Sequence, residues 1–236
     1  MIPTYKRAAL DHAKAEAPLE SCGLLVVVKG RKRYVPCRNR SRQQDVFLLD
    51  PDDYAAAEDL GEIIAIIHSH PNHPPVPSEA DRLSCERTAL PWFIVNPSTE
   101  EWGECLPTGY RAPLIGRQWI WGVSDCWTLA RDWYSQTWGL ELLDWDRPDT
   151  PEQFQHSPMF EDCWADAGFT VVVSDQPEIG DAILMQLGQV GLDHVAIYIG
   201  DGMLLHHISG RLSSRDLYGG YYQKQTGRIL RHASRR

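Results

Sequence analysis

The 236-residue sequence lacks several features that would assign it to a class at once. It has no run of about 18 apolar residues, so we expect no membrane-spanning helix. Its N-terminus lacks the basic-then-apolar pattern of a secretory signal, so we expect synthesis in a reducing cytoplasm. Its six cysteines show no Cys-x-x-Cys spacing, which argues against a thiolate zinc site. We expect most of them to be small buried residues rather than disulfide partners.

An excess of basic residues is also missing. The net charge is −9, and both halves are acidic: residues 1–108 carry 12 basic and 16 acidic side chains, and residues 109–236 carry 11 and 16. Neither half is basic overall, so we expect no nucleic-acid partner. The hydrophobic content of 43% is ordinary for a globular protein. At this length we expect two domains of about 100–130 residues each.

The hydrophobic pattern divides the chain into two halves. In the first half, helical and strand-like segments alternate, which predicts a mixed α/β unit. Pro107, Gly109 and Pro113 mark a change of pattern, and we place the linker there. The second half predicts a long helix followed by several strands. The predicted helices are residues 4–17, 54–60, 79 onward and 126–138, and the predicted strands are 22–28, 33–37, 46–49, 63–67, 92–95, 102–106, 171–173, 182–187, 194–199 and 203–208.

Two histidines lie two residues apart at the end of a predicted strand. The strand period puts the imidazoles of His68 and His70 on one side, and imidazole nitrogen is a good zinc ligand. Asp81, on the first turn of a predicted helix, offers a third ligand, and Glu20 offers a base for activating water. A structural interpretation fits the spacing equally well: the histidines can be polar strand ends, and Ser78-x-x-Asp81 can be a capping box.

The complete pattern is more specific than its parts. An upstream Glu, then His-Ser-His, then seven residues and Ser-x-x-Asp resemble the JAMM metalloprotease motif without a departure in spacing. The resemblance covers about residues 1–105. It implies a zinc ion (Zn2+) held by His68, His70 and Asp81, with Glu20 as general base and Ser78 as donor to the oxyanion. It also implies a JAMM-like mixed sheet flanked by helices.

Cys126 stands out among the cysteines. It follows Ser124 and Asp125 at the predicted start of a helix, where free amides and the helix dipole favour a thiolate and lower the thiol pKa. His194 begins a later strand and is the candidate base for this nucleophile. The structural alternatives are a buried thiol and a strand-end histidine.

The next strand offers two candidates for a third group that would orient His194. The hairpin turn between the strands lies at residues 200–202. A two-residue turn places His207 on the side of His194, whereas a three-residue turn places His206 there. Because a one-residue change in register flips the face, the residues alone leave both alternatives open.

Four segments, residues 125–129, 179–183, 193–202 and 205–206, together resemble NlpC-type cell-wall cysteine peptidases. The resemblance covers roughly residues 111–236 and implies a papain-like α+β domain. It implies Cys126 as nucleophile, His194 as base and His206 as orienting group. The Tyr that this family often has before the Cys is Leu114 here, which leaves the helix-start amide of Cys126 as the oxyanion donor.

A JAMM-like unit followed by an NlpC-like unit resembles the tail-tip assembly protein K family of long-tailed bacteriophages. We place the two domains at residues 1–107 and 111–236. The resemblance implies other tail-tip proteins and bacterial peptidoglycan as partners. It also implies a location in the host cytoplasm during assembly and then in the tail tip of the virion.

Two hydrolase activities are therefore expected. One is a cysteine endopeptidase that acts on the stem peptides of peptidoglycan, and the other is a zinc-dependent peptidase or isopeptidase. The alternatives are a mainly structural tail-tip protein with masked or relic sites, and a host papain-like amidase.

Overall fold

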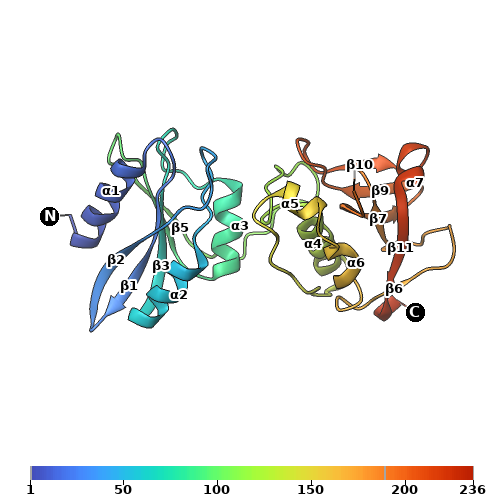
Figure 1. Cartoon of the computed structure of the whole chain (residues 1–236), viewed down its shortest axis with the longest axis horizontal. Helices are drawn as coiled ribbons and strands as arrows, with labels where there is room; N and C mark the ends of the chain where they lie inside the picture. Colours follow the sequence, from blue (N-terminus) through green and yellow to red (C-terminus); the bar gives the residue numbers. More distant parts are fainter. Residues whose placement is uncertain (1, 189, 236) are drawn as a thin grey trace. The chain divides into compact units, whose positions relative to one another are not determined.

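The structure, a computed structural model, describes residues 2–188 and 190–235. The chain divides into two compact units, Met1–Arg111 and Ala112–Arg236 (Figure 1). The predicted domain ranges include Met1, Gln189 and Arg236, which lie outside the described residues. Within the described part of the chain, no helix combines the length and apolar character needed to cross a membrane.

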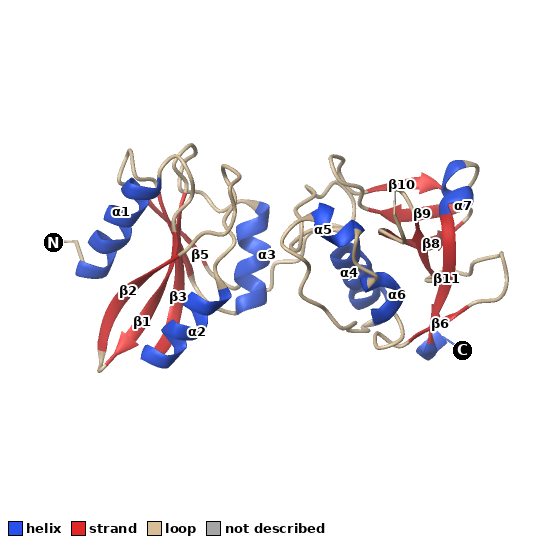
Figure 2. Ribbon diagram, in the orientation of Figure 1, coloured by secondary structure: helices blue, strands red, loops and turns tan. Residues whose placement is uncertain are grey.

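In the described part of the first unit, five strands form a sheet in the order β2-β1-β3-β4-β5. The strands are β1 (Cys22–Val28), β2 (Arg31–Cys37), β3 (Glu62–Ser69), β4 (Trp92–Val95) and β5 (Trp102–Cys105). The helices are α1 (Thr4–Glu16), α2 (Pro51–Leu60) and α3 (Glu79–Thr88) (Figure 2). Only β3 and β4 are parallel neighbours in this sheet, so the predicted mixed sheet flanked by helices is confirmed.

Both faces of β1 are covered, which explains its unbroken apolar sequence. Leu24 and Val26 pack in one core with Ala57 of α2. Leu25 points to the opposite face and packs with Ala9 of α1. A strand buried on both sides has no polar face to alternate with its apolar one.

In the described part of the second unit, six strands form an antiparallel sheet in the order β10-β9-β8-β7-β11-β6. The strands are β6 (Phe169–Val171), β7 (Ala182–Met185), β8 (His194–Gly200), β9 (Met203–His206), β10 (Ser214–Leu217) and β11 (Thr226–His232). The helices are α4 (Cys126–Trp138), α5 (Pro151–Gln155), α6 (Met159–Cys163), α7 (Tyr221–Gln225) and the 3-10 helix η1 (Ala233–Arg235). α4 packs against β8 and β9, and the predicted α+β class is confirmed.

Two predicted strands were wrong. Residues 46–49 form no strand, and a single bridge joins Asn39 to Leu49. The strand predicted at 171–173 lies two residues earlier, because β6 pairs with β11 only from Phe169 to Val171. In both cases an apolar stretch was expected to be a strand. The length and position of a strand depend on which residues find a partner strand, and apolar sequence alone does not show this.

Candidate functional sites

The β1–β3 pairing brings Glu20 to the histidine end of β3. The ladder sets Cys22 opposite His68. Beyond it, Ser69 N–H donates to Ser21 O at 3.0 Å, and Ser21 N–H donates to Ser69 Oγ at 2.8 Å. Glu20 Oε1 consequently lies 3.9 Å from His70 Nε2. The structure thus brings together two residues that are 50 positions apart in the sequence.

The three residues of the predicted metal site converge. His68 Nε2 lies 3.1 Å from His70 Nε2 and 3.1 Å from Asp81 Oδ1. His70 Nε2 lies 3.4 Å from Asp81 Oδ2. All three side chains are buried, and their candidate ligand atoms lie within 4.8 Å of one another. Two imidazoles and one carboxylate form a donor set that zinc prefers at catalytic sites.

The protonation of His70 suits a cation as well. His70 Nδ1 lies 3.1 Å from the carbonyl oxygen of Pro74, which can only accept a hydrogen bond, so Nδ1 carries the hydrogen. In the neutral ring Nε2 then carries no hydrogen, and its lone pair is free to bind a metal ion among the other ligands. Burial alone would raise the pKa of Asp81, but the close side chains of His68 and His70 outweigh it and hold that pKa far below its ordinary value. The residues therefore fit a zinc ion.

Glu20 has the environment of a proton acceptor that works near neutral pH. Its side chain is almost fully buried, and burial raises the pKa of its carboxyl group to about 8, although His70 opposes the shift. A raised pKa lets a carboxylate both take up and release a proton in this pH range.

Ser78 is the N-cap of α3. Its hydroxyl accepts from Asp81 N–H at 3.1 Å and donates to Asp81 Oδ2 at 2.7 Å, and the reciprocal bond completes a capping box. The capping interpretation of Ser-x-x-Asp is therefore correct, and Asp81 combines it with its place among the candidate ligands. His73, which the motif does not include, is exposed and pairs with Asp45.

In the second unit, Asp125 begins α4 and sets the position of Cys126. The Asp125 side chain accepts from Thr128 N–H, and Thr128 returns the bond in a capping box. Cys126 is thus the first helical residue. The backbone N–H groups of Val195 and Trp127 lie where they stabilise its thiolate. Val195 directly follows His194, so the thiol lies beside the strand that carries the candidate base.

A β-bulge selects the third group. Gly200 pairs with Met203, as a two-residue turn requires, but the register shifts between Tyr198 and Gly200. Ala196 therefore faces His206, which is the outcome predicted for the longer turn. His194 Nε2 lies 3.2 Å from His206 Nδ1, and both rings are buried. An extra residue within one strand cannot be recognised from hairpin propensities.

The prediction of a lowered thiol pKa at Cys126 was wrong. Burial raises the pKa of this thiol to about 12, and the charge of Asp125 adds to the effect. The helix-start amides act in the predicted direction but are too weak to offset the loss of solvation. Burial also lowers the pKa of His194 well below its ordinary value. The resting site therefore holds a neutral thiol and a neutral imidazole.

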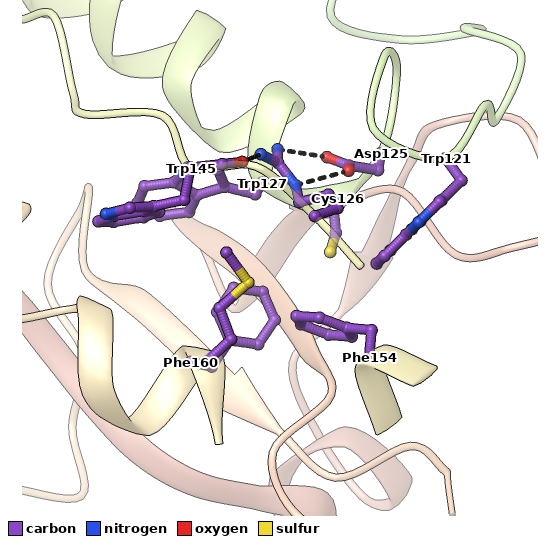
Figure 3. A pocket seen from close by; sticks show the side chains of 9 residues that line it. Trp121, Asp125, Cys126, Trp127, Trp145, Phe154 and Phe160 are labelled. Atoms are coloured by element: carbon purple, nitrogen blue, oxygen red, sulfur yellow. Dashed lines mark hydrogen bonds and ion pairs between the residues drawn. The ribbon is translucent and has the colours of Figure 1, made fainter. Parts of the chain in front are cut away.

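A mostly aromatic pocket adjoins Cys126 (Figure 3). Trp121, Phe154 and Phe160 lie around the Cys126 sulfur in this view. Arg147 also lines the pocket, but its guanidinium is 3.1 Å from Asp125, and it pairs with a second acid, Asp144. The arginine charge is thus neutralised within the protein, and the surface next to the thiol is apolar.

Sequence reasoning missed Asp216. Its Oδ2 atom lies 3.1 Å from His206 Nε2, and it also accepts a hydrogen bond from the Tyr222 hydroxyl at 2.9 Å. Asp216 belongs to β10, a short strand whose polar sequence gives no clear strand signal. Its spacing of ten residues from His206 would identify it only if the β9–β10 register were known.

The two units correspond to two known kinds of domain. The family described as prokaryotic homologs of the JAB domain matches residues 4–105, and the NlpC/P60 family matches residues 116–231. The first unit is therefore similar to JAB domains and the second to NlpC/P60 domains, and both families include hydrolases.

Three curated relatives match the chain. It is 41% identical over 228 residues to tail tip assembly protein K of Escherichia phage N15, covering 95% of this chain and 93% of the relative. It is 38% identical over 185 residues to tail tip assembly protein K of Escherichia phage lambda, with 78% and 89% covered. A third relative, desampylase of Pyrococcus furiosus, is 32% identical over 107 residues, with 42% and 76% covered. The chain belongs to the tail tip assembly protein K family.

Proposed function

We propose that the protein is a component of a phage tail tip and that its second domain, residues 111–236, cuts the stem peptides of bacterial peptidoglycan. The observation that carries the proposal is the buried contact of 3.2 Å between His206 and His194, whose neighbour Val195 has its backbone N–H at the Cys126 thiol. The names of the two phage relatives support the tail-tip assignment. The protein is then made in the host cytoplasm, joins other tail-tip proteins and meets peptidoglycan from the virion.

The chemistry follows from the three side chains. His194 takes the proton from the Cys126 thiol as sulfur attacks the peptide carbonyl. The backbone amide of Cys126 stabilises the oxyanion, and His194 returns its proton to the leaving amine. Water, deprotonated by His194, then hydrolyses the thioester and regenerates the thiol. His206 keeps the His194 ring in place throughout.

Digestion of purified peptidoglycan tests this proposal. We expect soluble muropeptide fragments from the wild type and a decrease of about 10⁶-fold in Cys126→Ala, as measured for loss of another covalent nucleophile. Glu20→Gln is the matched control, because it alters the other site and should leave fragment release unchanged. Equal release by wild type and Cys126→Ala would falsify the proposal. Absence of fragments from every variant would favour an architectural tail protein, and turnover of small amides alone would favour an amidase.

We further propose that the first domain, residues 1–107, is a zinc-dependent peptidase or isopeptidase. The match to a protein named desampylase and the convergence of His68, His70 and Asp81 support this assignment. When bound, zinc supplies Lewis acidity that lowers the pKa of water and polarises a carbonyl group. Glu20 accepts the proton from the attacking water, and Ser78 donates to the oxyanion after its hydroxyl turns away from Asp81.

Processing of co-expressed tail proteins tests the second activity. We expect Glu20→Gln to abolish cleavage by this site while the purified protein keeps about one zinc per chain, as one closed donor set predicts. Cys126→Ala serves as the control. Unchanged processing in Glu20→Gln, or loss of processing in Cys126→Ala alone, contradicts the assignment.

A further inference from the structure

Asp216 and His206 share one face of the second sheet. The register between β9 and β10 sets Ser214 opposite His206 and Asp216 opposite Leu204. Residues two apart on a strand point to the same side, so Asp216 and His206 are diagonal neighbours on that face. Their 3.1 Å contact extends the His194–His206 pair by one group.

The carboxylate gives this chain of contacts a direction. An ionised carboxylate only accepts hydrogen bonds, so Nε2 of His206 carries the hydrogen. A neutral His206 then has a bare Nδ1, which accepts from Nε2–H of His194 across 3.2 Å. A neutral His194 is left with a bare Nδ1, which is the nitrogen able to receive a proton.

Each group is held in the protonation state that this direction requires. Burial lowers the pKa of His194 and of His206, so both rings are neutral near pH 7. Burial acts to raise the pKa of Asp216, but hydrogen bonds from His206 and Tyr222 outweigh it, and the pKa lies below its ordinary value. The acid therefore keeps its negative charge.

The position of Asp216 is fixed by further contacts. The Tyr222 hydroxyl and Arg211 Nη1 donate to Oδ2 at 2.9 and 3.2 Å, and the Ser214 hydroxyl donates to Oδ1 at 3.3 Å. A carboxylate restrained by several donors orients its partner better than a free one.

We propose that Asp216 is a positioning residue of the cysteine site, which fixes the Nε2–H tautomer of His206 and, through it, of His194. The effect of Asp216 on catalysis rests on the proposed cysteine-peptidase function, whereas the tautomers can be measured without substrate. Asp216 would thereby keep Nδ1 of His194 as the proton acceptor.

The direct test is long-range 1H–15N NMR of the full-length protein with 15N-labelled histidine, with signals assigned from His194→Gln and His206→Gln. We expect the Nε2–H tautomer at both histidines in the wild type. In Asp216→Asn the amide is able to donate to His206, so the Nδ1–H form should appear at both rings. Asp175→Asn changes an exposed acid of the same unit and should alter neither.

Two results would overturn the inference: an Nδ1–H tautomer at either histidine of the wild type, or unchanged tautomers in Asp216→Asn. The wild-type result stands even if Asp216→Asn does not fold. Asp216→Glu, which keeps the charge, should restore the wild-type tautomers.

Kinetics separate this inference from the proposed function. We expect kcat for stem-peptide hydrolysis to fall about 10²-fold in Asp216→Asn with KM nearly unchanged, because a wrong tautomer costs up to about 10⁴-fold in a Ser-His-Asp triad. A normal kcat in this variant contradicts the positioning role. A wild-type protein with the expected tautomers but no hydrolysis contradicts the proposed substrate and leaves the positioning of His194 intact.

Discussion

At the scale of single residues, the protonation of Cys126 determines how the second site works. With a pKa of about 12 the thiol is neutral at pH 7, and His194 must remove its proton during attack. Papain-type sites instead keep a stable thiolate–imidazolium pair. The difference arises because the thiol is buried and its nearby cation, Arg147, is already paired with Asp125.

We therefore predict the pH dependence of Cys126 alkylation. Iodoacetamide reacts with the thiolate, so the rate should rise about tenfold per pH unit from pH 7 to 10 without a plateau. Site-resolved mass spectrometry of the folded protein measures the rate. The same residue in urea should level off above about pH 9, near the ordinary thiol pKa. A plateau below pH 7 in the folded protein would show an ion pair and contradict the raised pKa.

Local spacing made His68, His70 and Asp81 predictable, because the residues come from one strand end and the helix that follows it. Their roles as ligands remain proposals. Asp216, in contrast, could not be predicted from local spacing. It reaches His206 only through a β9–β10 register that depends on the whole sheet, and no short-range pattern encodes that register.

At the scale of elements, capping signals and strong turn signals were the most reliable guides. Asp125 starts α4 as the sequence predicts, and Asp50 caps α2 ahead of Pro51, within three residues of the predicted start at residue 54. These signals are local, so tertiary contacts do not change them. The β8–β9 hairpin was harder to predict. Its turn has two residues, but the bulge makes Ala196 face His206, which was expected only for a three-residue turn.

Gly103 of β5 provides a prediction at this scale. A Cβ atom there would lie 1.6 Å from the carbonyl oxygen of Pro75, so Gly103→Ala must displace the proline loop. The neighbouring Pro74 carbonyl holds the His70 ring. We expect Gly103→Ala to destabilise the first domain by about 1–3 kcal/mol, a typical cost of overpacking, and to weaken zinc binding.

Thermal unfolding and zinc competition with a chromophoric chelator measure these two effects. Gly219→Ala is the control, because a Cβ atom there meets no atom within 4 Å. Zinc affinity equal to that of the wild type in Gly103→Ala would mean that the proline loop does not position His70.

At the scale of the whole molecule, each unit has its own core and its own candidate site. The first core gathers residues of α2, α3 and the first sheet, and the second is built on α4 and the second sheet. The acidic charge is also divided between the halves, so composition does not identify either half as the one that binds a partner. The two chemistries should therefore respond separately to changes at either site.

Removal of zinc tests this separation. A ligand that binds only the folded state adds stability, by about 4 kcal/mol when its free concentration is 1,000 times Kd. Chelation should therefore increase amide hydrogen exchange around His68, His70 and Asp81 and leave residues 112–236 unchanged, as read by mass spectrometry of the full chain. Unchanged exchange in the first unit would remove the zinc assignment. Increased exchange in β8 and β9 would instead show that the metal site stabilises the cysteine site, because those strands carry His194 and His206.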